Sequence, residues 1–152
     1  MHYITLLFFT AILAGLVLQF WLYYRQSTHV MVHRDAVPQA FAQQVSLADH
    51  QKAAAYTLAK IQLERIDLIV HTIILLGWTL GGGLELLFSF WLRMELSSLL
   101  AEGLAILSIL FIGVILELPL SLWRTFRLEQ RFGFNRTNLA MFFKDLSLEI
   151  LL

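Results

Sequence analysis

The sequence contains no cysteine, which excludes disulfide bonds, thiolate metal sites and cysteine nucleophiles. It also lacks an excess of either charge. Its 11 Lys and Arg residues balance 11 Asp and Glu residues, so no basic field favours nucleic acid as a partner. No Lys or Arg lies among Met1, His2 and Tyr3, which is not typical of a cleaved signal peptide. We therefore expect no nucleic-acid partner and a retained N-terminal segment.

Hydrophobic residues, in contrast, are abundant and gathered in blocks. They make up 59% of the 152 residues, and the mean hydropathy is +0.72, whereas soluble domains average about 45–50% apolar residues. The blocks predict transmembrane helices at about 3–24, 66–91 and 99–123. A fourth helix is predicted to start at about 139, and the sequence ends inside it as if truncated. We therefore expect an all-α, polytopic membrane helical bundle that forms a single domain over 1–152.

Lys and Arg are distributed unevenly between the segments outside these spans. None precedes the first span, five lie in 25–65, one lies in 92–98 and five lie in 124–145. Loops rich in Lys and Arg remain on the cytoplasmic side of a membrane. We therefore expect an integral membrane protein whose N-terminus faces outward and whose loops 25–65 and 124–138 are cytoplasmic.

The first of these loops carries a helix start signal. Ser46 is followed three residues later by Asp49, which resembles a capping box. The alanine-rich stretch after it favours helix. We expect this helix to form a cytoplasmic stalk, with its charged part at 52–65, and to continue into the second span.

Two pairs of residues that include histidine have a spacing that places both partners on one helix face. His29 and His33 are four residues apart, but a zinc protease helix needs a glutamate directly after its first histidine, and Val30 stands there. Asp67 and His71 have the same spacing within the second span. They predict either a proton relay or metal corner, or a hydrogen bond between helices, because polar groups inside a membrane face protein or water.

Three further acids lie within the spans. Glu102 and Glu117 are about 22 Å apart along one helix and share a broad face, and Glu85 lies on the second span. They are interpreted either as groups lining a hydrated chamber or as contacts between helices.

Two features are predicted to perturb the spans. The triplet Gly81-Gly82-Gly83 favours close packing or a local break in the second span. Pro119 is expected to kink the third span near its cytoplasmic end.

The segment 125–137, TFRLEQRFGFNRT, contains Phe126-x-x-Glu129-x-x-x-Gly133-Phe134-Asn135. It resembles a signature in the N-terminal membrane domain of the CAAX prenyl protease 1 family, a family of polytopic zinc metalloendopeptidases. Further stretches are similar to family segments in the same order, and the first of them looks like the first loop of bacterial members: 33–38, 55–60, 80–84 and 144–146.

The resemblance implies membrane helices around a hydrated chamber and a zinc site, His-Glu-x-x-His, in a later domain on the cytoplasmic side. It makes Glu85, Glu102 and Glu117 candidate chamber-facing acids. The family signature loop would comprise Glu129, Gly133, Phe134, Asn135 and Thr137. In this loop we expect Gly133 to provide a turn where a side chain would clash. Asn135 or Thr137 is expected to cap the helix near 139, and Glu129 to pair with Arg131, Arg136 or a basic group of the missing domain.

None of the five histidines is followed by the required glutamate, so no catalytic residue and no metal ligand is assigned to this chain. Zinc is implied for the full-length protein only. The sequence therefore predicts the membrane half of a metalloprotease of the bacterial inner membrane, inactive alone. Its partners would be the lipid bilayer and a catalytic domain supplied in cis or in trans. A stand-alone scaffold or regulatory protein is the alternative, and a small transporter or ion-conducting subunit is a third reading.

Overall fold

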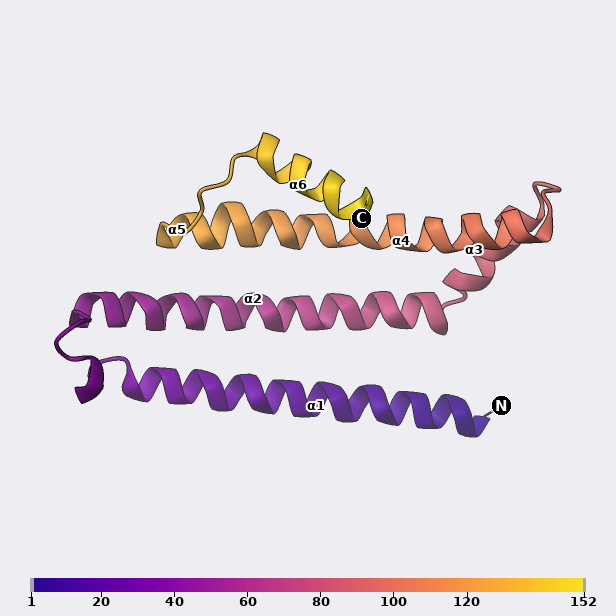
Figure 1. Cartoon of the computed structure of the whole chain (residues 1–152). Coiled ribbons are helices and arrows are strands. Elements are labelled where there is room, and N and C mark those ends of the chain that lie inside the picture. Colours follow the sequence, from indigo (N-terminus) through magenta and orange to yellow (C-terminus); the bar gives the residue numbers. More distant parts are fainter. Residues whose placement is uncertain (1, 152) are drawn as a thin grey trace.

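A computed structural model describes residues 2–151, with side chains described up to residue 148, and this part of the chain contains helices and turns but no strand (Figure 1). The predicted all-α class is therefore confirmed. In chain order the elements are α1 (His2–His33), the 3-10 turn η1 (Gln39–Phe41), α2 (Leu47–Thr79), α3 (Gly83–Leu92), α4 (Ser98–Trp123), the π-helical turn η2 (Arg124–Glu129), α5 (Gln130–Phe132) and α6 (Leu139–Leu151).

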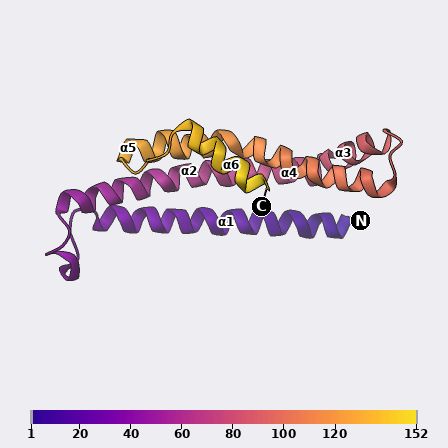
Figure 2. The same ribbon diagram turned by 45° about the horizontal axis from the view of Figure 1, so that its top comes forward.

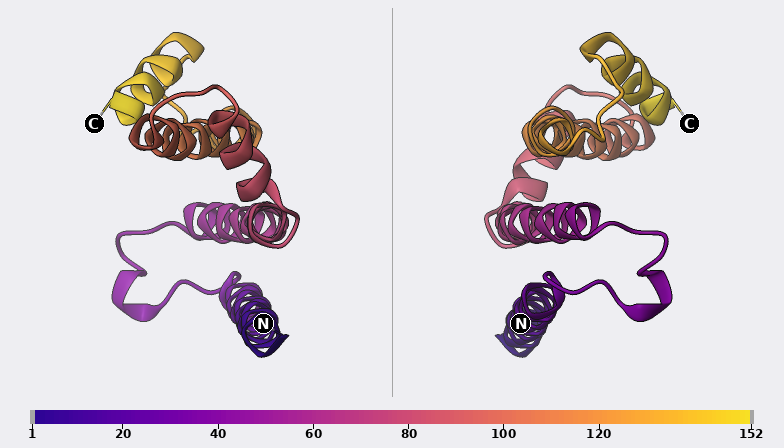
Figure 3. Two further views of the ribbon diagram at one scale, coloured as in Figure 1. Left: turned by 90° about the vertical axis from the view of Figure 1, so that its right-hand side faces the viewer. Right: turned by 90° about the vertical axis from the view of Figure 1, so that its left-hand side faces the viewer.

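The long helices form an open row instead of a closed bundle. Viewed end-on, α1, α2 and α4 follow one another, and α6 lies beyond α4 (Figure 3). Neighbouring long helices run in opposite directions, and α6 crosses α4 obliquely (Figure 2). The loop between α1 and α2 therefore shares one end of the molecule with α5, and the N-terminus shares the other end with α3 (Figure 1).

Few side chains are buried between these helices. Those with less than a tenth of their surface exposed are Ala54, Ile61, Leu63, Ala101, Ala105 and Leu128. Many large apolar residues of α1 and α4 are exposed instead. In a membrane, lipid tails cover such surfaces as well as protein does, so an open row needs no large internal core.

In the part of the chain that the structure describes, two helices are long and apolar enough to cross a membrane, His2–His33 and the continuous stretch Ser98–Phe132. The predicted second span, 66–91, differs because it is divided between α2 and α3, which meet at an angle of 49°. The apolar part of α2, from 66 to 79, rises only about 21 Å, short of a hydrocarbon core of about 30 Å. A third crossing therefore requires α2 and α3 together.

The glycine triplet explains this break. Gly82 has φ +75°, a left-handed conformation that favours glycine. A Cβ at Gly81 would lie 2.7 Å from the carbonyl oxygen of Gly77, and one at Gly83 would lie 2.9 Å from the Trp78 ring. The predicted local break is therefore confirmed, and larger residues would not fit at two of the three positions.

The start of α2 also follows the sequence prediction. The Ser46 hydroxyl oxygen accepts a hydrogen bond from the Asp49 backbone N–H at 3.1 Å, and the same hydroxyl donates to the Asp49 carboxylate at 2.6 Å. The helix then runs without interruption to Thr79. Ser46 is thus the N-cap, as predicted.

The third span continues through Pro119 into η2 and α5. The regular α geometry changes at Arg124, where the backbone winds into a π-helical turn. Such turns occur mostly as short insertions in α-helices and are frequent at functional sites. A bend at Pro119 itself stays a prediction.

Candidate functional site

The signature loop turns at a left-handed glycine. Gly133 has φ +77° and ends α5. Its N–H donates to the Gln130 carbonyl at 3.1 Å, and the Phe134 N–H donates to the Glu129 carbonyl at 2.9 Å. These two bonds form a Schellman motif, which satisfies carbonyl groups that the end of a helix leaves free. The predicted turn at Gly133 is present, but an added Cβ would lie 3.8 Å from Lys52 Nζ, so its cause is the backbone conformation and not a clash.

The next residues connect this turn to α6, which starts at Leu139 as predicted. The Asn135 side chain accepts a hydrogen bond from the Thr137 N–H at 2.7 Å and closes a local turn. The cap of α6 is Asn138, whose side-chain oxygen accepts from the Met141 N–H at 2.8 Å. The predicted cap at Asn135 or Thr137 is therefore wrong. Asn138 directly precedes the helix, and asparagine is a favoured N-cap residue, so the sequence could have predicted this cap.

The signature loop packs against the first part of α2. The Tyr56 ring lies 5.4 Å from the Phe132 ring and 4.9 Å from the Phe134 ring, edge to face in both cases. Lys52 Nζ lies 5.5 Å from the centre of the Phe134 ring. Aromatic and cation contacts of this geometry each contribute about 0.5–1.5 kcal/mol. The structure thus brings the 55–60 segment and the signature loop together, a contact that the sequence analysis missed.

Glu129 is half-buried at the start of this loop. Within residues 2–151 its carboxylate has no basic partner closer than 4.0 Å. The predicted pairing with Arg131 or Arg136 is therefore absent from the described chain. A pairing with a separate domain stays a prediction.

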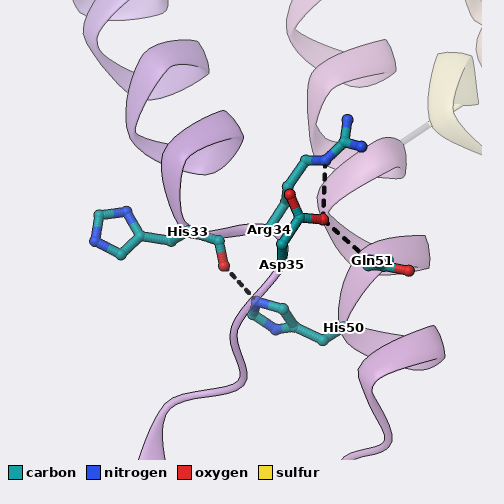
Figure 4. Close-up of polar contacts among 5 residues, drawn as sticks. All are labelled: His33, Arg34, Asp35, His50 and Gln51. Carbon is teal, nitrogen blue, oxygen red and sulfur yellow. Dashed lines mark hydrogen bonds and ion pairs between the residues drawn. The ribbon is translucent and has the colours of Figure 1, made fainter.

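The loop between α1 and α2 is held on α2 by two side chains (Figure 4). The His50 ring nitrogen Nε2 lies 3.0 Å from the His33 carbonyl oxygen. The Asp35 carboxylate accepts from Gln51 Nε2 at 3.0 Å and pairs with Arg34 at 3.3 Å. The segment 33–38 is thus fixed to the same end of α2 as the signature loop.

Asp67 and His71 lie together on α2 and reach a second element. His71 Nδ1 is 2.9 Å from the Asp67 carbonyl oxygen and 3.5 Å from its carboxylate. The other carboxylate oxygen of Asp67 is 3.5 Å from the Arg124 guanidinium. The pair therefore bridges α2 to the π-helical turn at the end of α4, the arrangement of a polar contact between helices.

The three candidate chamber acids are exposed and are not brought together. Glu85 lies in the first turn of α3. Glu102 accepts a hydrogen bond from the Ser98 hydroxyl at 2.8 Å. Glu117 lines a groove of about 790 Å³ along α4, to which Leu146 of α6 contributes. Only Glu117 thus lies beside a sizeable groove.

The described side chains of this chain form no zinc site. No group of three or more His, Cys, Asp and Glu side chains that could hold a metal ion occurs in residues 2–148. The His29 and His33 rings lie 4.2 Å apart, and His33 Nδ1 is 2.8 Å from the His29 carbonyl oxygen. The pair therefore stacks along α1 and bonds to its own backbone.

Comparison with known proteins identifies the family. A family model described as CAAX prenyl protease N-terminal, five membrane helices, matches residues 26–152. A CAAX prenyl protease 1 homolog from Dictyostelium discoideum is 28% identical over 141 residues, which cover 88% of this chain and 32% of that relative. The chain thus spans about a third of the length of the relative that it matches, and no solved structure matches. With its long apolar helices and its signature loop folded on α2, this chain is an integral membrane protein and belongs to the CAAX prenyl protease N-terminal domain family.

Proposed function

We propose that this chain is the membrane-embedded part of a CAAX prenyl protease 1-like zinc metalloendopeptidase. It would anchor the enzyme, form part of a chamber wall and provide a docking surface for a catalytic domain that is absent from this chain. The match of residues 26–152 to the N-terminal domain of that family carries the proposal. Zinc and the hydrolytic residues would belong to the catalytic domain, so this chain alone would hydrolyse nothing.

The signature loop is the proposed docking surface. Its backbone is held by the Schellman motif and its aromatic side chains rest on Tyr56, so it presents a preorganised surface to a partner. Phe134 remains 51% exposed, and the Glu129 carboxylate has no basic partner within residues 2–151. An exposed aromatic side chain and a free carboxylate are suited to a partner with an apolar pocket and a basic group.

The open row of helices supports the chamber-wall role. Its helices expose many apolar side chains, which either lipid tails or a further set of membrane helices would cover. Glu85, Glu102 and Glu117 would then face the enclosed space, since acids inside a membrane turn toward water or protein. We propose that the end that carries the signature loop is cytoplasmic, because both Lys- and Arg-rich segments lie at that end. A bacterial inner membrane is proposed because segment 33–38 resembles the first loop of bacterial members.

Co-expression tests the proposal. The chain is produced with the catalytic segment of a CAAX prenyl protease 1 relative, purified by a tag on the chain, and assayed for zinc-dependent cleavage of a prenylated peptide. We expect the two parts to purify together and to be active, whereas each part alone is inactive.

Variants locate the docking surface in the same experiment. Changing Glu129→Gln and Phe134→Ala together should reduce co-purification by at least tenfold, because both contacts with the partner are lost. Tyr24→Ala, at an exposed position of α1, is the matched control and should behave as the parent chain. A chain that accumulates stably but neither binds nor activates any catalytic segment would instead favour the scaffold or regulatory alternative.

A further inference from the structure

A second groove lies between α2 and the turn that follows α4. It has a volume of about 550 Å³ and is lined by both elements: Ala59, Gln62, Leu63 and Ile66 from α2, and Trp123, Phe126, Arg127, Leu128, Gln130 and Arg131 from the end of α4, η2 and α5. Leu63 and Leu128 are buried, with 6% and 8% of their surface exposed. The groove thus has an apolar floor between two elements that are packed together.

Two arginines without an ion-pair partner line this groove. Arg127 and Arg131 both line it, and no acid does. In the described part of the chain, neither guanidinium has a carboxylate within 4.0 Å. Like charges four residues apart on a helix repel one another. An anion between them would remove this repulsion and accept hydrogen bonds from both.

The lack of an ion-pair partner is specific to the two arginines of the groove and is not shared by every arginine of the segment. Arg124 lies in the same turn, but its guanidinium pairs with Asp67 of α2 at 3.5 Å. Glu129 lies between the two groove arginines in sequence but does not line the groove. The local winding therefore leaves Arg127 and Arg131 together without an acid.

The position of the groove indicates where its ligand comes from. Trp123 is the last residue of α4 and of the predicted span 99–123, and it is 61% exposed. Ile66, the first residue of the predicted span 66–91, is 53% exposed. Tryptophan is enriched at the boundary between lipid tails and headgroups. With the span at 99–123, as predicted from the sequence, the guanidiniums would lie just beyond the apolar part of the membrane, at the depth of phosphate groups.

We propose that this groove binds the headgroup of an anionic phospholipid. Arg127 and Arg131 would hold the phosphate through charge-assisted hydrogen bonds, which the ammonium group of a lysine can also make. The side-chain amides of Gln62 and Gln130, which also line the groove, would donate to the remaining headgroup oxygens, and the acyl chains would lie along Ile66 and Trp123. This site does not depend on the proposed catalytic partner.

Trp123 provides the probe for the test. The chain, with Trp21, Trp78 and Trp91 changed to Phe, is reconstituted in phosphatidylcholine nanodiscs that contain a small fraction of either brominated phosphatidylglycerol or brominated phosphatidylcholine. Bromine on the acyl chain quenches a nearby indole. We expect phosphatidylglycerol to quench Trp123 at a much lower lipid fraction than phosphatidylcholine does.

Arginine variants then separate charge from structure. Each arginine near a membrane surface contributes a roughly fivefold preference for anionic lipid, so Arg127→Gln with Arg131→Gln should reduce the phosphatidylglycerol preference roughly 25-fold. Arg127→Lys with Arg131→Lys keeps the charge and should restore most of it. The matched control is Arg34→Gln with Arg136→Gln, which removes two exposed charges at the same end of the molecule but outside the groove, and it should reduce the preference at Trp123 far less because both groove guanidiniums remain.

Several outcomes would overturn the proposal. Equal quenching by both lipids would show no selective site, and an equal loss in the Arg34 and Arg136 control would show only a general surface charge effect. Failure of the lysine variant to restore the preference would show a structural role for the arginines. If inorganic phosphate or an acidic peptide at millimolar concentration displaced phosphatidylglycerol from Trp123, the site would belong to a soluble ligand.

Discussion

Gly133 shows how one residue sets the shape of the signature loop. Its φ of +77° allows the two hydrogen bonds that end α5 and turn the chain toward α6. Its nearest outside neighbour, Lys52 Nζ, would be only in ordinary contact with an added Cβ. The glycine is required because a side chain disfavours the left-handed backbone region, which costs about 1 kcal/mol.

We therefore predict that Gly133→Ala lowers the free energy of unfolding by about 1 kcal/mol, because alanine keeps the contact but not the conformation. Thermal unfolding of the purified chain in detergent measures this change. Gly103→Ala is the control, since Gly103 lies in α4 with open space around it and alanine favours a helix. Equal unfolding temperatures for Gly133→Ala and the parent chain would show that the turn does not need glycine.

At the scale of elements, α2 has two roles that the sequence assigned to separate segments. Its first half receives the 33–38 segment through His50 and Gln51 and the signature loop through Tyr56, and its second half enters the apolar region. The helix start at Ser46 was predictable because a cap is a contact between neighbours in sequence. The contact between Tyr56 and Phe134 was not, because it joins residues far apart in the chain.

A double-mutant cycle on Tyr56 and Phe134 tests this contact. We predict that Tyr56→Leu and Phe134→Leu each reduce stability and that their coupling energy is about 0.5–1.5 kcal/mol, the range for an aromatic pair. Chemical unfolding of the four proteins in detergent gives the coupling. Tyr24→Leu paired with Phe134→Leu should show none, because Tyr24 is exposed on α1. Additive effects of the first pair would mean that the loop does not rest on α2.

At the scale of the whole molecule, the order and direction of the helices decide which loops lie at the same end. The antiparallel row places the α1–α2 loop and the signature loop at one end and the turn after α3 at the other (Figure 1). This arrangement is compatible with the distribution of Lys and Arg, because both rich segments lie at the same end. Hydropathy alone predicted one span at 66–91, whereas the structure divides this segment between α2 and α3.

The absence of native cysteine allows a direct test of orientation. We predict that single cysteines introduced at Ser46 and Arg136 react with a membrane-impermeant maleimide only after the cell membrane is opened. A cysteine at Glu95, in the turn after α3, should react in intact cells. Labelling of all three from the same side would contradict the topology with both basic segments in the cytoplasm.

The sequence by itself determined the helical class, two helices long and apolar enough to cross a membrane, the Ser46 cap, the place where the second predicted span is perturbed and the resemblance to the protease family. These features depend on composition and on contacts between residues that are close in sequence, so the local sequence is sufficient to predict them. Only the tertiary structure decided that the signature loop rests on Tyr56, that Asp67 pairs with Arg124, and that Arg127 and Arg131 share a groove without an acid. Each of these depends on how helices distant in the chain are placed side by side, and hydrophobic periodicity does not encode that placement.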